Sequence, residues 1–200
     1  MKRTGIIIFL FLLHTTIIFA QDEENKKADE LPPTSWSQMA GTMFYLYSTK
    51  INGQTYTGIN SLGVYGFRYN FKNIGKRSVL SASAVPGLGF AFYSGFGGNN
   101  VYFSFDLPLM LEFHTGLLAS PYTEEVPVGF FAGGGIGINY LDKAFYLSNP
   151  KSGFSYGPAV NAGIKLKLGS RAFILRGSYL YNLNNEVPDL KGIGVLWGGR

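Results

Sequence analysis

The chain has 200 residues and a formal charge of +5, with 46% hydrophobic and 16% aromatic residues and no cysteine. This length suits one domain, and the absence of cysteine excludes disulfides and cysteine-ligated metal sites. The basic residues are scattered singly, which argues against a nucleic-acid-binding surface. Twenty-seven glycines, many aromatics and no helical apolar spacing after Asp29 predict an all-β protein.

The first twenty residues have the pattern of a secretory signal. Lys2 and Arg3 give a positive start, and an apolar stretch with polar interruptions covers residues 5–19. A spanning helix needs ~20 clean apolar residues, and this stretch falls short. We therefore expect cleavage between Ala20 and Gln21, which lowers the formal charge to +3.

Three regions follow from this reading. Residues 1–20 are the signal peptide, residues 21–36 are a polar N-terminal leader, and residues 37–200 form the folded domain. The leader is charged and poor in apolar residues, so we expect it to be disordered. Beyond the leader the balance stays basic, which is compatible with binding to anionic lipid.

Turn residues divide the domain into eight strand segments. Their spacing of near 20 residues is too long for a typical sandwich and predicts a meander of long antiparallel strands. The segments are Met39–Ser48, Thr57–Asn73, Arg77–Ser94, Asn100–His114, Glu125–Leu141, Gly153–Leu168, Arg171–Leu183 and Lys191–Gly199.

The fourth segment has the clearest pattern. Residues 101–114 read VYFSFDLPLMLEFH, in which every second residue from Val101 to Phe113 is large and apolar. The residues between them hold all the polarity, and a period of two indicates a strand. At roughly 3.3 Å per residue the stretch spans about 45 Å. A strand this long, with one apolar and one polar face, predicts a sheet with lipid on one side.

Side-chain size predicts which face points outward. Eight strands enclose just enough room for side chains, so the bulky apolar faces would overfill the interior. Small and charged residues fit inside, and closure leaves no unpaired sheet edge in hydrocarbon. We therefore expect an all-β fold, an eight-stranded antiparallel up-and-down transmembrane β-barrel with aromatic girdles at both boundaries. The expected girdle residues are Trp36, Phe71, Phe173 and Trp197 near the termini and Phe92, Tyr102, Tyr140 and Tyr181 at the other end.

The polar faces carry a set of ionisable residues that we expect inside the barrel. Buried charges are costly unless they are paired, so this set is expected to form a structural network. The alternative is that it lines a narrow ion path. The set comprises Arg68, Lys72, Asp106, Glu112, His114, Lys165, Lys167 and Arg176.

His114 is the only histidine after the signal. With Glu112 two residues before it and Thr115 after it, a hydrolytic site is conceivable. A zinc site would have to rely on carboxylates, since one histidine remains. The glycine run 133–137 lies within an expected strand with no helix after it, so it does not predict a phosphate-binding loop. We assign no catalytic residue, cofactor or metal ligand.

The signal ending in Ala–Gln and the strands DLPLMLEFH and FFAGGGIGINYL resemble small outer-membrane β-barrel proteins of Gram-negative bacteria. The resemblance is closest to the porin-like family common in the Bacteroidota, and it covers the chain from about Ser37 onward. It implies an outer-membrane location, contact with lipid and lipopolysaccharide, handling by the outer-membrane insertion machinery, and no known activity. Such barrels usually end in an aromatic residue, whereas here Trp197 precedes Gly198, Gly199 and Arg200.

The expected role is structural or interactive at the cell surface, with an unidentified partner and no nucleic acid. Three alternatives stay open at this point. The barrel could be a narrow pore for small solutes, or a lipid A-modifying hydrolase centred on His114. It could also be a soluble lipocalin-like binding barrel, in which the two faces would be reversed and Arg68, Lys165 and Lys167 would lie in water.

Overall fold

The computed structural model describes residues 35–51, 54–95, 98–120, 123, 125–141, 153–184 and 188–199. The expected signal peptide and residues 21–34 of the expected leader lie outside this part of the chain. The strands are β1 (Ser35–Ile51), β2 (Gln54–Asn73), β3 (Ser78–Ala84), β4 (Gly87–Gly95), β5 (Gly98–Gly116), β6 (Val128–Leu141), β7 (Gly153–Leu168), β8 (Arg171–Leu180) and β9 (Leu190–Gly199). Within the described ranges no helix is long and apolar enough to cross a membrane.

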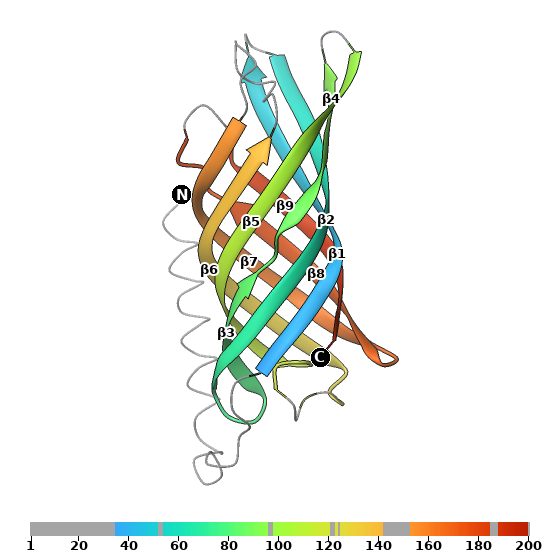
Figure 1. Ribbon diagram of the computed structural model, residues 1–200, viewed down its shortest axis with the longest axis vertical. Coiled ribbons are helices and arrows are strands. Elements are labelled where there is room, and N and C mark those ends of the chain that lie inside the picture. Colours follow the sequence, from blue (N-terminus) through green and yellow to red (C-terminus); the bar gives the residue numbers. More distant parts are fainter. Residues whose placement is uncertain are drawn as a thin grey trace.

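The strands close into a barrel. The strands pair antiparallel with their neighbours around the barrel, and β1 pairs with both β2 and β9, which completes the ring (Figure 1). β3 and β4 occupy one position in this ring, because both of them lie between β2 and β5. The ring therefore has eight positions, which confirms the expected eight-stranded antiparallel up-and-down barrel.

The third expected strand is interrupted in the middle. β3 ends at Ala84 and β4 begins at Gly87, with Val85 and Pro86 between them. Pro86 lies opposite the part of β5 that contains Pro108, and proline has no N–H to donate across the ladder. The carbonyl oxygens of both prolines still accept backbone hydrogen bonds, so the wall stays continuous.

The two ends of the barrel differ. One end, called here the terminus-side end, holds the start of β1, the end of β9 and the β2–β3, β5–β6 and β7–β8 connections. At the other end the β1–β2 and β4–β5 hairpins extend beyond their neighbours β9 and β6 (Figure 1). The pairing of β1 with β9 stops at Leu46, and that of β5 with β6 stops at Ser104.

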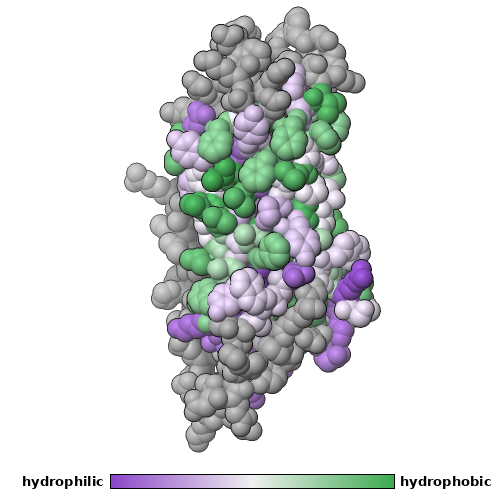
Figure 2. Space-filling view, in the orientation of Figure 1, coloured by the Kyte–Doolittle hydropathy of each residue, from purple (hydrophilic) through white to green (hydrophobic). Residues whose placement is uncertain are grey.

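The outer surface carries the large apolar side chains, as expected from their size. Leu109 is 42% exposed and Leu111 is 63% exposed, whereas Arg68 and Glu112 are each 2% exposed. Figure 2 shows hydrophobic residues spread over the middle of the barrel wall. An apolar surface this large is unlike that of a soluble monomer and matches a lipid-facing belt. The lipocalin-like alternative, which needs the opposite orientation, is therefore wrong.

The interior is more apolar than the sequence suggested. Met39, Met43, Tyr45 and Tyr47 of β1 all face inward and pack with apolar residues of the other strands. Tyr102, expected in the outer girdle, packs against this inner cluster instead. The remaining buried members of the cluster are Leu62, Val64, Val85, Ala91, Met110, Phe131, Leu141, Ala159, Ile174, Leu180, Leu190 and Leu196.

Candidate functional site

Most of the buried ionisable side chains lie in the half of the barrel nearest the termini. Glu112 and His114 lie two residues apart on β5 and therefore point to the same side of the sheet. Across the ladder, Glu112 lies opposite Gly133 of β6, which lies opposite Asn161 of β7. A Cβ at Gly133 would lie 2.7 Å from Cγ of Glu112, so glycine leaves the space through which Glu112 reaches Asn161.

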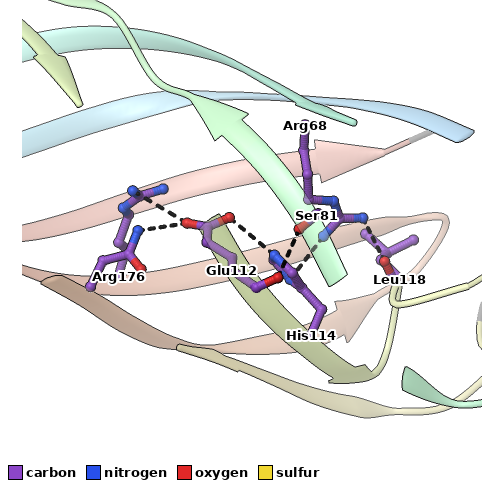
Figure 3. Close-up of polar contacts among 7 residues, drawn as sticks. Arg68, Ser81, Glu112, His114, Leu118 and Arg176 are labelled. Atoms are coloured by element: carbon purple, nitrogen blue, oxygen red, sulfur yellow. Dashed lines mark hydrogen bonds and ion pairs between the residues drawn. The ribbon is translucent and has the colours of Figure 1, made fainter. Parts of the chain in front are cut away.

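Glu112 is the acceptor at the centre of the network (Figure 3). Its Oε1 accepts a hydrogen bond from Nδ2 of Asn161 at 2.6 Å and lies 3.5 Å from Nη2 of Arg176. Its Oε2 accepts from Nε2 of His114 at 3.0 Å. Both oxygens of the carboxylate thus have donors, as a buried charge requires.

His114 connects Glu112 to Arg68. Nη1 of Arg68 lies 3.0 Å from Nδ1 of His114, and Nη2 donates to the carbonyl oxygen of Leu118 at 2.6 Å. A guanidinium group has only donors, so Nδ1 of His114 must be the acceptor of this hydrogen bond. The geometry therefore assigns a neutral imidazole whose proton lies on Nε2 and is donated to Glu112.

Phe131 of β6 packs against this network from inside the barrel. Its ring stacks on the imidazole of His114 with centroids 5.3 Å apart. Nζ of Lys165 and Cζ of Arg176 each lie 5.9 Å from the ring centroid, within cation–π range. The aromatic ring thus contacts three of the cationic or basic groups that the barrel buries.

A second carboxylate lies farther along β5. Oδ2 of Asp106 accepts a hydrogen bond from the hydroxyl of Tyr45 at 2.6 Å, and Oδ1 accepts one from Asn139 at 3.4 Å. Next to Asp106 is a cavity of about 20 Å³, which Tyr45, Asn161 and Arg176 also line. This volume holds about one water molecule.

Six of the eight expected interior residues are buried together, and two are not. Arg68, Asp106, Glu112, His114, Lys165 and Arg176 are each at most 4% exposed. Lys72 is exposed, because the β2–β3 ladder shifts register between Asn70 and Lys72. Lys167 lies near the end of β7 and donates to Glu125 at 2.7 Å.

Several residues of the site were not singled out from the sequence. Tyr45, Asn139, Asn161 and Phe131 all contact the buried charges. Alternation along β6 and β7 places Phe131, Asn139 and Asn161 on the inner face, and this was the available signal for them. The choice of partner depends on cross-strand register, which alternation does not give.

The surroundings of His114 do not assemble the hydrolytic trio considered from the sequence. His114 is 1% exposed, and its ring contacts are Glu112, Arg68 and Phe131. The hydroxyl of Thr115 accepts a hydrogen bond from Ser78. Among the described residues no group of three His, Asp or Glu side chains could hold a metal ion. The arrangement provides hydrogen-bond partners for buried charges.

Comparisons with known proteins extend the result on the fold. No protein-family model matches the sequence, and neither does any curated protein. Among solved structures, the attachment invasion locus protein Ail of Yersinia pestis, solved with the heparin analogue sucrose octasulfate, has a TM-score of 0.50 at 12% identity. The match covers 84% of this chain and 98% of that chain. The likeness shows the fold alone.

Two further structures match less closely. The N-terminal β-barrel domain of Pseudomonas aeruginosa OprF has a TM-score of 0.44 at 12% identity, and covers 82% of this chain and 97% of its own. Neisserial surface protein A has a TM-score of 0.42 at 12% identity, with 84% and 97% covered.

Proposed function

We propose that the protein is an integral outer-membrane β-barrel with a structural or surface-interaction role and a closed interior. The observation that carries this proposal is the combination of an apolar outer belt with charged side chains that are buried inside and contact one another there. The proposal includes cleavage between Ala20 and Gln21, insertion by the outer-membrane machinery and contact with lipopolysaccharide. It also includes membership of the porin-like barrels of the Bacteroidota, which rests on the sequence resemblance.

The interior contacts support a closed barrel over a pore. Arg68, His114, Glu112 and Arg176 form a continuous line of contacts from one strand to another across the lumen. The cavity beside this line holds about one water molecule, so it offers no path for a hydrated solute. Large inner side chains from β1, such as Met43 and Tyr45, fill the next level.

Conductance tests the closed interior. The purified mature chain, inserted into a planar bilayer, is expected to give no steady unitary currents. Replacing Glu112 and Arg176 together by alanine removes one of the contacts that cross the lumen and provides a variant with a wider interior for comparison. Unitary currents from the unaltered protein, at the size found for this variant, would contradict a closed barrel.

Fractionation tests the location. In cells that express the full chain, we expect the protein in the outer-membrane fraction, with the change in gel mobility on heating that folded barrels show. Recovery of folded protein from the soluble periplasmic fraction would contradict the proposal.

His114→Ala is expected to leave the lipid A pattern of these cells unchanged, because the imidazole is enclosed by Arg68, Glu112 and Phe131.

A further inference from the structure

The terminus-side end of the barrel carries a concentration of positive charge that the proposed function does not use. Among the described residues, the charged side chains at this end that reach solvent are five cations and the carboxylate of Glu125. We call the five cations the cationic rim: Lys72, Lys76, Arg77, Lys167 and Arg171.

The cationic rim lies on two sides of the barrel. Lys72, Lys76 and Arg77 come from the end of β2 and the β2–β3 connection, whereas Lys167 and Arg171 flank the β7–β8 turn. These groups are separated around the ring by β1 and β9 on one side and by β5 and β6 on the other. In Figure 2 hydrophilic residues are visible at the lower right, over the β7–β8 turn of Figure 1.

A β-bulge aims Lys72 at this surface. Strict alternation from Arg68 and Asn70 would turn Lys72 inward, but Phe71 has no partner in the β2–β3 ladder. The extra residue reverses the alternation, so that Phe71 and Lys72 are both exposed. Bulges commonly re-aim a side chain in this way. The bulge therefore places the positive charge of Lys72 on the outer surface instead of in the interior.

The cationic rim adjoins an aromatic girdle. Lys72 directly follows Phe71, which is 43% exposed. Arg171 lies two residues, or about 7 Å along the strand, from Phe173, whose ring meets Trp197 edge-on at a centroid distance of 5.1 Å. Aromatic girdles settle at the headgroup level of a bilayer. The cations therefore reach the level of the lipid phosphates.

Lys167 differs from the other members, because its ammonium donates to Glu125 at 2.7 Å. This hydrogen bond lowers the pKa of the Glu125 carboxyl, which keeps the pair ionised and neutral overall. The net positive charge of the cationic rim thus comes from the other four members. Lys72 and Arg171 lie beside the girdle, and Lys76 and Arg77 lie in the β2–β3 connection.

We propose that the cationic rim binds the phosphate groups of anionic phospholipids in the leaflet at the terminus-side end. In an outer-membrane barrel this is the periplasmic leaflet, where the short turns lie. The inference rests on the proposed function, because it needs a barrel that spans a bilayer. The position beside the lipid-facing girdle favours lipid headgroups over a soluble acidic partner. Each Lys or Arg near an anionic surface is expected to favour the bound state about fivefold.

The test uses asymmetric vesicles. The mature chain with an N-terminal tag is folded into phosphatidylcholine vesicles whose phosphatidylglycerol is confined to the leaflet on the side of the termini, with the orientation checked by protease access to the tag. The ratio of folded to unfolded barrel in denaturant is compared with the same ratio in pure phosphatidylcholine. We call the factor by which phosphatidylglycerol raises this ratio the anionic advantage. A variant combining Lys72→Gln, Arg77→Gln and Arg171→Gln is expected to lose about a hundredfold of the anionic advantage at low salt.

Two matched controls define the outcome. A variant combining Lys72→Arg, Arg77→Lys and Arg171→Lys keeps the charge and should keep the advantage, and Lys191→Gln, exposed on β9 at the opposite end, should keep it as well. The proposal would be overturned if the glutamine variant kept the full anionic advantage. It would also be overturned if phosphatidylglycerol in the opposite leaflet gave the unaltered protein an equal advantage. Failure of every variant to insert into phosphatidylcholine would instead overturn the proposed function, and the cationic rim with it.

Discussion

The two carboxylates inside the barrel are held by different kinds of partner. Glu112 accepts from His114 and Asn161 and faces Arg176, so its charge is balanced by a nearby guanidinium. Asp106 accepts from the neutral hydroxyl of Tyr45 and the amide of Asn139. Removal of Glu112 should therefore leave cations unbalanced, whereas removal of a partner of Asp106 should remove a single hydrogen bond.

Glu112→Gln tests the first of these roles. The substitution keeps the shape of the side chain but leaves Arg68, Lys165 and Arg176 buried with one carboxylate instead of two. Breaking a buried pair in this way is expected to lower the free energy of unfolding by about 3–5 kcal/mol. Urea unfolding in vesicles, followed by gel mobility without heating, measures the change. Glu125→Gln, at a side chain that is 93% exposed, should leave the unfolding midpoint unchanged; equal effects of both variants would contradict the network.

Tyr45→Phe tests the second role. The variant removes the donor to Asp106 and leaves the carboxylate with Asn139 alone, which should lower the free energy of unfolding by about 1–3 kcal/mol. Tyr65→Phe is the matched control, since the hydroxyl of Tyr65 donates to Gln38 at 2.6 Å on the exposed surface. The same unfolding assay should show little change for Tyr65→Phe, and a larger loss there than at position 45 would count against the buried hydrogen bond.

Single positions show where sequence patterns stop being informative. Alternation along β5 places Asp106, Glu112 and His114 on the inner face, and the structure buries all three. The same rule fails at Lys72, because one unpaired residue in β2 reverses the faces. A bulge depends on how two strands fit together, and neither strand reveals it when read alone.

At the scale of strands, the turn residues placed the elements well. The expected segment Gly153–Leu168 coincides with β7, and the ends of most other segments differ from the observed strands by a few residues. The expected strand Arg77–Ser94 is divided into β3 and β4 at Val85 and Pro86, beside the part of β5 that contains Pro108. Proline is visible in a sequence, but its cross-strand partner is not.

The β1–β9 ladder closes the barrel, and Gly41 is expected to be essential to it. A Cβ at this position would overlap the carbonyl oxygen of Val195 and lie 2.6 Å from Cα of Leu196 on β9. Both obstacles are backbone atoms, so Gly41→Ala should force the two strands apart and lower the free energy of unfolding by about 1–3 kcal/mol.

Gly134→Ala is the control for Gly41→Ala. A Cβ at Gly134 would meet only the carbonyl oxygen of Ala159, at 3.8 Å, which is ordinary contact. Urea titration of both variants in the same vesicles should show a lower unfolding midpoint for Gly41→Ala alone. A lower unfolding midpoint for Gly134→Ala than for Gly41→Ala would contradict the importance of the close approach of β1 to β9 at Gly41.

At the scale of the whole molecule, the sequence predicts which face of the barrel wall points outward, because side-chain size and side-chain polarity both indicate the same orientation. Bulky groups such as Leu111 have room only outside, and charges such as Arg176 find partners only inside. The apolar layer formed by Met43, Tyr45 and their neighbours was not predicted. In β1 apolar residues lie on both faces, and polar residues such as Ser37 and Gln38 also lie on both, so polarity does not distinguish its inner from its outer face.

The outer belt provides a test that distinguishes a lipid-facing wall from a water-facing one. Leu109, 42% exposed on β5, lies near the middle of the apolar stretch between Val101 and Phe113. An arginine near the bilayer midplane should lower the free energy of unfolding by about 2–4 kcal/mol in vesicles. Leu168→Arg, at a 55% exposed residue next to the β7–β8 turn, should cost at most ~1 kcal/mol because it lies near the interface. In water an exposed arginine would be harmless at either position, so equal and negligible effects would show that Leu109 does not face hydrocarbon.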